Sequence, residues 1–321
     1  MLRRVAAGAL LRLSLPTLDQ LPRQFVLRRD GCLTVASLVR AALEPDPLTC
    51  LLTVDLRNAF NCVSRTAVIE ASDKSPLARY SRWCYSTSSR LRYGSYIIDS
   101  KSGVQQGDPA GPALFAMALS FALQRARTSF APDLLDLWYA DDGVLVGSAT
   151  EVTQGFTHLI EPLTSIGLEI NKDKIFFVGF KYRNRHRMRA PVRERNNYNH
   201  PIIVLGYPAE GAPTAVSSFI SNAVDRSSTS VEAISRLCHA QGEACILRAC
   251  GPTSKLRHLL RFCDVRDLKD WIPLSDKITL DCVERIIARP CPPGWQRVAA
   301  APANMGGLEF MLLHDLDCRT L

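Results

Sequence analysis

The sequence contains no long apolar run, no paired-cysteine motif and no internal repeat, and each absence excludes a class of protein. The longest largely apolar stretch, residues 110–123, is shorter than the ~18 residues that a membrane-spanning helix requires, so we expect no membrane partner. The eleven cysteines include no C-x-x-C pair, which argues against thiol-redox and zinc-finger motifs. Their odd number and apolar surroundings predict free thiols in a reducing, intracellular compartment. The lack of a repeat excludes solenoid and propeller folds.

Acidic residues are absent from the beginning of the chain. None precedes Asp19, whereas residues 1–16 contain three arginines, a composition typical of a mitochondrial presequence. Apolar side chains at helical spacing, among them Leu2, Val5 and Leu10, favour instead an amphipathic helix that belongs to the fold. We prefer this interpretation, and mitochondrial import stays open as the alternative.

The remaining composition is that of a globular protein. Of the 321 residues 47% are hydrophobic and 22% charged, which suits one large domain or two ordinary ones with a sizeable core. The formal net charge of +8 favours an anionic partner. A basic segment at 181–195 contains seven Lys or Arg and one acid; it suits either a solvated loop or a nucleic-acid contact.

Hydrophobic periodicity predicts alternating helices and strands. The expected elements are helix 35–44, strand 48–55, helix 57–71, short strand 92–100, helix 113–125, hairpin 134–148 with its turn at 140–143, helix 151–166, strand region 168–180, short strand 202–208, and helices from about 216 onward. This order predicts an α+β fold built on the split β-α-β arrangement of a ferredoxin-like antiparallel sheet with helices on one face.

Two adjacent aspartates, Asp141 and Asp142, interrupt the apolar hairpin "LWYADDGVLVG". Burying unpaired carboxylates there costs several kcal/mol, on the order of the penalty for any uncompensated buried charge. In the split fold, strand 48–55 lies beside the hairpin, which brings Asp55 to the same sheet edge. Three carboxylates without a neighbouring cation in sequence predict a site for hard divalent metal ions, and two such ions support phosphoryl transfer.

The chain resembles the reverse transcriptases of non-LTR (LINE-like) retrotransposons. "VDLRNAFN", "GVQQGDPAGPALFAMAL", "YADD" and "GLEINKDK" are similar to consecutive motifs A, B, C and D of that family. The segments "LPRQFVLRRDG", before motif A, and "VLGYP", after motif D, extend the resemblance, as does "HAQGEACILRACGPTSKLRHLLR" further on. Four motifs in the right order form a specific signal.

The resemblance implies a right-hand polymerase palm with partial fingers and a C-terminal helical thumb-like region. From this resemblance we expect partial fingers at 1–50, a palm at 51–215 with a basic insertion at 181–200, and a thumb or connection region at 216–321. Family members carry further fingers strands before the segment that corresponds to "LRRVAAGALL" here, and a Gly-rich stretch near Gln24. This chain lacks both, so we expect an N-terminally truncated relative, and no endonuclease signature occurs.

The implied function is an RNA-directed DNA polymerase that extends a primer 3′-hydroxyl with two Mg²⁺, for which Mn²⁺ would substitute. Its partners would be an RNA template, a DNA primer and dNTPs, and copying primed at a genomic target implies access to the nucleus. The sequence identifies no protein partner. The alternative is a catalytically inactive reverse-transcriptase remnant that only binds nucleic acid.

Carried over by position, Asp55 and Asp141 would be metal ligands, Asp142 the third acidic member of the site, and the main-chain carbonyl of Leu56 a further ligand. In the basic insertion, four arginines would contact nucleic acid: Arg183, Arg185, Arg187 and Arg189.

Four further residues match nucleotide-binding positions of the family. Phe60 corresponds to the aromatic steric gate against a ribose 2′-hydroxyl; the alternative is a core aromatic residue. Gln106 and Gly107 would contact the incoming nucleotide and template, because glycine permits close backbone approach; the alternative is an ordinary turn. Lys174 corresponds to the motif D lysine, a proton donor to pyrophosphate; the alternative is an exposed lysine at a strand end.

Overall fold

The computed structural model describes residues 2–18, 21–179, 192–194, 200–290, 292, 294–301, 310 and 312–313. The chain forms two compact units, Met1–Asn197 and Tyr198–Leu321, each with its own hydrophobic core. None of the helices that it describes combines the length and the apolar character needed to cross a membrane.

The first unit is a mixture of helices and strands. Its elements are α1 (Leu2–Leu18), α2 (Gly31–Leu43), β1 (Cys50–Val54), α3 (Ala59–Cys62), α4 (Arg65–Ser72), α5 (Ala78–Tyr85), β2 (Ser89–Tyr93), β3 (Tyr96–Ser100), α6 (Gly111–Arg127), β4 (Leu135–Tyr139), β5 (Asp142–Gly147), α7 (Ala149–Ser165), η1 (Lys172–Lys174), β6 (Phe176–Gly179) and β7 (Val192–Glu194). The predicted α+β class is therefore confirmed.

A five-stranded sheet in the order β4-β5-β1-β6-β7 forms the centre of this unit. All neighbouring strands run antiparallel except β6 and β7, which are parallel. The predicted juxtaposition of the first strand with the hairpin is confirmed, because β1 pairs with β5 along its whole length, from Cys50 opposite Gly147 to Val54 opposite Gly143.

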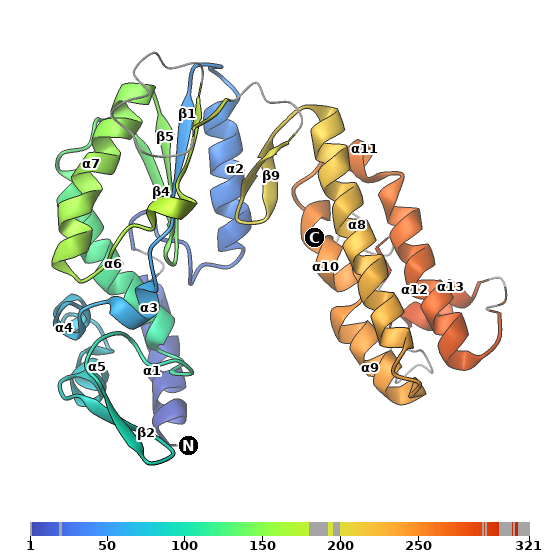
Figure 1. Cartoon of the computed structure of the whole chain (residues 1–321), viewed down its shortest axis with the longest axis horizontal. Helices are drawn as coiled ribbons and strands as arrows, with labels where there is room; N and C mark the ends of the chain where they lie inside the picture. The colour runs from blue at the N-terminus through green and yellow to red at the C-terminus, as the bar shows by residue number, and fades with distance from the viewer. Residues whose placement is uncertain are drawn as a thin grey trace. The chain divides into compact units, whose positions relative to one another are not determined.

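Helices cover both faces of this sheet. Figure 1 shows α7 on one side of strands β1, β4 and β5 and α2 on the other. Helix α7 begins at a capping box formed by Ser148 and Glu151 and ends before Gly167, whose φ of +79° a glycine adopts readily. Helix α2 buries the stripe Val35, Ala36, Val39 and Leu43. The sequence predicted helices on one face alone, because the split motif does not assign α2.

Two predicted elements of the first unit are divided in the structure. The helix expected over 57–71 is two helices, α3 and α4, because Val63 and Ser64 are extended; the Ser64 hydroxyl then accepts the hydrogen bond from Ala67 N–H that begins α4. The short strand expected over 92–100 is the end of a hairpin, β2–β3, whose turn begins at Gly94 with φ +60°. Helix α5 was not predicted.

The second unit contains a two-stranded sheet and six helices within the described residues. They are β8 (Ile202–Val204), β9 (Tyr207–Glu210), α8 (Pro213–Ser235), α9 (Ala240–Cys250), α10 (Pro252–Leu260), α11 (Val265–Leu268), α12 (Trp271–Ile287) and α13 (Trp295–Ala300). Helix α8 packs against α9, α10 and α12.

The division between units falls after Asn197, earlier than the predicted palm boundary at 215. The single short strand expected at 202–208 is instead β8 and the beginning of β9, which pair as a separate hairpin. Its Tyr207 ring packs against His258 of α10 and against Phe262, at centroid distances of 5.3 and 5.0 Å. These aromatic contacts attach the hairpin to the helices. Residues 1–50, predicted as partial fingers, lie in the first unit.

Candidate functional site

The acidic residues of the predicted site meet at one end of the central sheet. Tyr139 pairs with Asp142 across the β4–β5 hairpin, which leaves Ala140 and Asp141 as a two-residue turn. Asp55 directly follows Val54, whose partner in the register is Gly143. Because antiparallel register fixes which residues are neighbours, Asp55 arrives beside this turn.

The carboxylates influence one another electrostatically. Burial, and then the negative charge of Asp55, raise the pKa of Asp141 above its ordinary value, while Lys174 acts in the opposite direction. Burial raises the pKa of Asp142 too, followed by the charges of Asp141 and Asp55. The end of the sheet therefore concentrates negative charge that a cation would stabilise.

Two residues of motif D bind the carboxylate of Asp55. Its carboxylate accepts a hydrogen bond from Asn171 Nδ2 at 3.0 Å and forms an ion pair with Lys174 Nζ at 3.2 Å. The Lys174 side chain is 65% exposed, so this ion pair is largely screened by solvent. The predicted Lys174 thus lies at the acidic site, paired with the aspartate of motif A.

The backbone around Leu56 is bonded to the segment that precedes motif D's lysine. Arg57 N–H donates to Glu169 and Asn171 N–H donates to Asp55, so the groups on either side of Leu56 face the segment 169–171. Strand backbone groups alternate in direction, which turns the Leu56 carbonyl to the opposite side, where β5 lies. The role of this carbonyl as a metal ligand stays a prediction.

The donor set suits a divalent metal ion in its chemistry, since carboxylate and carbonyl oxygens are the ligands that Mg²⁺ and Mn²⁺ prefer. However, the described part of the chain holds no group of three or more His, Cys, Asp or Glu side chains arranged to hold a metal. One oxygen of Asp55 faces the Lys174 ammonium instead. The assignment of Asp55, Asp141, Asp142 and Leu56 as ligands therefore stays a prediction.

Phe60 lies on α3, one turn after motif A begins. Its ring stacks on Phe115 of α6 with centroids 4.5 Å apart and an angle of 22° between the planes. The side chain is half-buried against the core of the unit. This packing is that of a core aromatic residue at the edge of the core, and the role of Phe60 as a steric gate stays a prediction.

The motif B loop reaches the surface at Gln106 and Gly107, both exposed. Gly107 has φ +80°, which favours glycine, and its carbonyl accepts a hydrogen bond from Arg4 Nε at 3.2 Å. The loop is therefore an exposed backbone segment with a fixed conformation. Contact of Gln106 and Gly107 with a nucleotide stays a prediction.

A buried carboxylate missed in the sequence holds this loop in place. Asp108 accepts hydrogen bonds from the hydroxyls of Tyr80 and Tyr85 at 2.8 and 2.6 Å, and forms an ion pair with Arg3 at 3.4 Å. Burial, and then the hydrogen bond to Asp108, raise the pKa of Tyr85. One side chain thereby joins α1 and α5 to motif B.

The four arginines predicted to bind nucleic acid, Arg183, Arg185, Arg187 and Arg189, lie outside the described residues.

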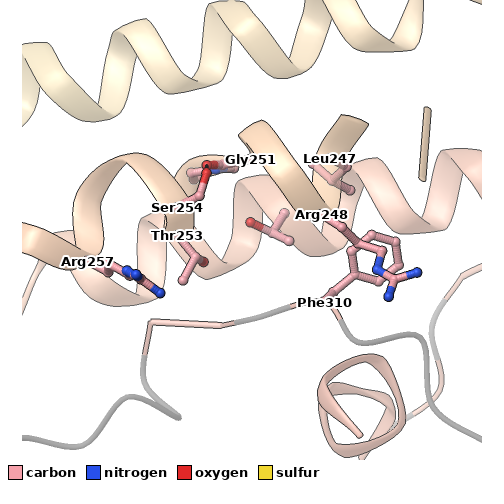
Figure 2. Close-up of a pocket in the computed structure, with 9 residues that line it drawn as sticks. Leu247, Arg248, Gly251, Thr253, Ser254, Arg257 and Phe310 are labelled. Atoms are coloured by element: carbon pink, nitrogen blue, oxygen red, sulfur yellow. Dashed lines mark hydrogen bonds between the residues drawn. The ribbon is translucent and has the colours of Figure 1, made fainter. Parts of the chain in front are cut away.

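The second unit contains a small cavity between its helices (Figure 2), with a volume of about 40 Å³. Its lining residues are Leu247, Arg248, Gly251, Pro252, Thr253, Ser254, Arg257, Thr279 and Phe310. Thr253, at the beginning of α10, is 4% exposed, and its hydroxyl oxygen has no hydrogen-bond partner. No acidic side chain lines the cavity, so it lacks the hard oxygen ligands of the first site.

Two curated proteins are similar to this chain in sequence. The chain is 24% identical over 276 residues to the retrotransposable element SLACS 132 kDa protein of Trypanosoma brucei gambiense, covering 80% of this chain and 22% of that protein. It is 31% identical over 172 residues to the retrovirus-related Pol polyprotein from type-1 retrotransposable element R2 of Nasonia vitripennis, covering 48% and 17%. The chain thus spans about a fifth of the length of these curated relatives.

Among solved structures, apo telomerase from Candida tropicalis matches with a TM-score of 0.50 and 12% identity, covering 88% of this chain and 58% of that one. This similarity shows a shared fold. The family model described as "Reverse transcriptase (RNA-dependent DNA polymerase)" matches residues 7–208, which include Asp55, the acidic turn and motif B. The chain therefore belongs to the reverse transcriptase family.

Proposed function

We propose that this chain is an RNA-directed DNA polymerase that transfers nucleotides to a primer 3′-hydroxyl. The observation that carries the proposal is the β1–β5 pairing, which brings Asp55 to the Ala140–Asp141 turn in a chain of the reverse transcriptase family. A purely structural role accounts poorly for three carboxylates at one sheet end, because burial and the neighbouring negative charges raise the pKa of Asp141 and Asp142.

The substrates would be an RNA template, a DNA primer and dNTPs, copied on behalf of a retrotransposon. The names of the relatives SLACS and R2 support this origin. The net charge of +8 supports binding to a phosphate backbone.

Reverse transcriptases work with divalent metal ions, and here we propose two Mg²⁺, for which Mn²⁺ would substitute. Asp55, Asp141 and Asp142 would hold them, together with the Leu56 carbonyl. Bound ions of this kind lower the pKa of the attacking hydroxyl and stabilise the departing pyrophosphate.

The chain's own residues would orient the substrates. Phe60, fixed by its stacking on Phe115, would exclude a nucleotide that carries a 2′-hydroxyl. The exposed backbone at Gly107 would allow the base pair to approach closely. Lys174 would leave Asp55 to give a proton to pyrophosphate, a change that its exposed side chain permits.

Primer extension on an RNA template with a DNA primer and Mg²⁺ or Mn²⁺ tests the proposal. We expect extension by the wild type and a loss of more than about 100-fold in Asp141→Asn, since losing even an outer partner of a metal ligand costs about 10–100-fold. Asp173→Asn is the matched control, because this nearby aspartate is 88% exposed and lies 3.9 Å from Arg57.

The opposite result would be no extension by the wild type, together with template binding that weakens steeply with salt and is unchanged in Asp141→Asn. That outcome would replace the polymerase by the alternative, a reverse-transcriptase remnant that only binds nucleic acid.

A further inference from the structure

The turn that carries Asp141 has an unfavourable backbone conformation. Ala140, its first residue, has φ +53°, in the left-handed region. Glycine is the favoured residue there, and a residue with a Cβ atom costs roughly 1–2 kcal/mol. A conformation of this kind persists only where neighbouring groups hold it.

The group that holds it is the side-chain amide of Gln24, which bonds both backbone groups of Ala140. Gln24 Oε1 accepts from Ala140 N–H at 3.0 Å, and Gln24 Nε2 donates to the Ala140 carbonyl at 3.2 Å. One side chain thus fixes the peptide groups on both sides of the Ala140 Cα, and these set the direction in which the chain enters Asp141.

Gln24 is itself fixed. Its Oε1 also accepts from the backbone N–H groups of Phe25 and Val26, at 3.1 and 3.2 Å. The side chain is 2% exposed, so water does not compete for these bonds. Because both polar atoms of this amide are hydrogen-bonded and almost no solvent reaches it, its orientation is fixed.

The segment around Gln24 is attached to strand β4 like a further strand. Phe25 N–H donates to the Trp138 carbonyl at 2.8 Å, and Trp138 N–H donates to the Arg23 carbonyl at 2.9 Å. Arg23 also forms an ion pair with the buried Asp136 at 2.5 Å. Gln24 therefore holds the turn from a rigid base.

We propose that Gln24 is a positioning residue that fixes Ala140 in the left-handed conformation and thereby aims Asp141 and Asp142 at Asp55. It touches neither nucleotide nor metal and acts through the Ala140 backbone. The inference rests on the proposed function, because it takes these carboxylates to be metal ligands.

The experiment compares Gln24→Met, which keeps the length of the side chain and removes its donor and acceptor, with the wild type. The first measurement is the affinity for Mn²⁺ alone, by electron paramagnetic resonance well below the unfolding temperature. The second is hydrogen exchange at the Ala140 amide. Arg23→Met is the matched control, because Arg23 belongs to the same segment but does not bond Ala140 through its side chain.

We expect Gln24→Met to weaken Mn²⁺ binding at least about tenfold, as loss of an outer partner of a metal site does, and to expose the Ala140 amide to exchange. Arg23→Met should lower the unfolding temperature and leave Mn²⁺ affinity within about twofold of the wild type, which separates positioning from stability.

A Mn²⁺ affinity of Gln24→Met within about twofold of the wild type would overturn the inference, as would a wild type whose Mn²⁺ affinity does not depend on Asp141. A different result would contradict the proposed function alone: a wild type that binds Mn²⁺ at these carboxylates but extends no primer.

Discussion

Replacing Asp136 by asparagine should destabilise the first unit more than any other single charge removal in the β4 region. Asp136 is completely buried and takes part in ion pairs with Arg127, at 2.6 Å, and Arg23, at 2.5 Å. The Arg127 side chain is 15% exposed, so this pair counts as buried, and removing one member costs about 3–5 kcal/mol. Arg23 is 42% exposed, and its pair adds about 1 kcal/mol or less.

The expected loss in the free energy of unfolding is therefore about 4 kcal/mol, which corresponds to an unfolding temperature lower by roughly 8–16 °C for a unit of this size. Urea unfolding followed by tryptophan fluorescence measures it, because Trp138 is completely buried in the same strand. Asp133→Asn, at an exposed position just before β4, should change stability by less than about 0.5 kcal/mol. A loss below about 1 kcal/mol in Asp136→Asn would refute the reasoning.

Three other substitutions test the site and the core. Asp141→Asn should raise the unfolding temperature at pH 7 in the absence of divalent ions. The pKa of Asp141 is raised in the folded chain, so the ionised carboxylate destabilises the fold at pH values above that pKa. The difference in unfolding temperature between variant and wild type should shrink as the pH falls towards 3.8, the ordinary pKa of an aspartate. An unchanged difference across a pH series would contradict this. Gly103→Ala should destabilise by more than about 1 kcal/mol in urea unfolding, because φ is +73° and the new Cβ would lie 2.5 Å from the Asn61 carbonyl oxygen; equal stability would contradict it. Thr253→Val should raise the free energy of unfolding by about 1 kcal/mol in a thermal scan, since it removes a buried hydroxyl without a partner, and a loss would show that the hydroxyl is bonded.

The elements that assemble the acidic residues were predictable because they carry local signals. The run of apolar residues before Asp55 indicates a buried strand, and the apolar segments around Asp141 indicate a hairpin. Once both are placed in a split β-α-β sheet, their adjacency follows from topology. The register, with Val54 opposite Gly143, agrees with the two-residue turn.

The residues that support the site were not predictable, because their roles depend on contacts distant in sequence. Gln24 lies 116 residues from Ala140, and nothing in "LPRQFVLRRDG" marks its amide as buried. Asp108 in "QQGDPAGP" reads as a turn residue, whereas its partners Tyr80 and Tyr85 belong to α5, a helix whose apolar pattern is too short to identify. The sequence predicted only the second half of the hairpin β2–β3, because β2 is short and mostly exposed and has no buried face to mark it.

The long-range bonds of the N-terminal segment can form only late in the synthesis of the chain on the ribosome. Arg3 can form its ion pair only after Asp108 has been synthesised. Gln24 can form its hydrogen bonds only after Ala140, 116 residues later in the chain, has been synthesised. At a ribosomal speed of roughly 5–20 residues per second, that interval is about 6–23 s. During synthesis the first helices are thus exposed without the contacts that hold them in the finished fold, and this is when a chaperone would find the nascent chain most accessible.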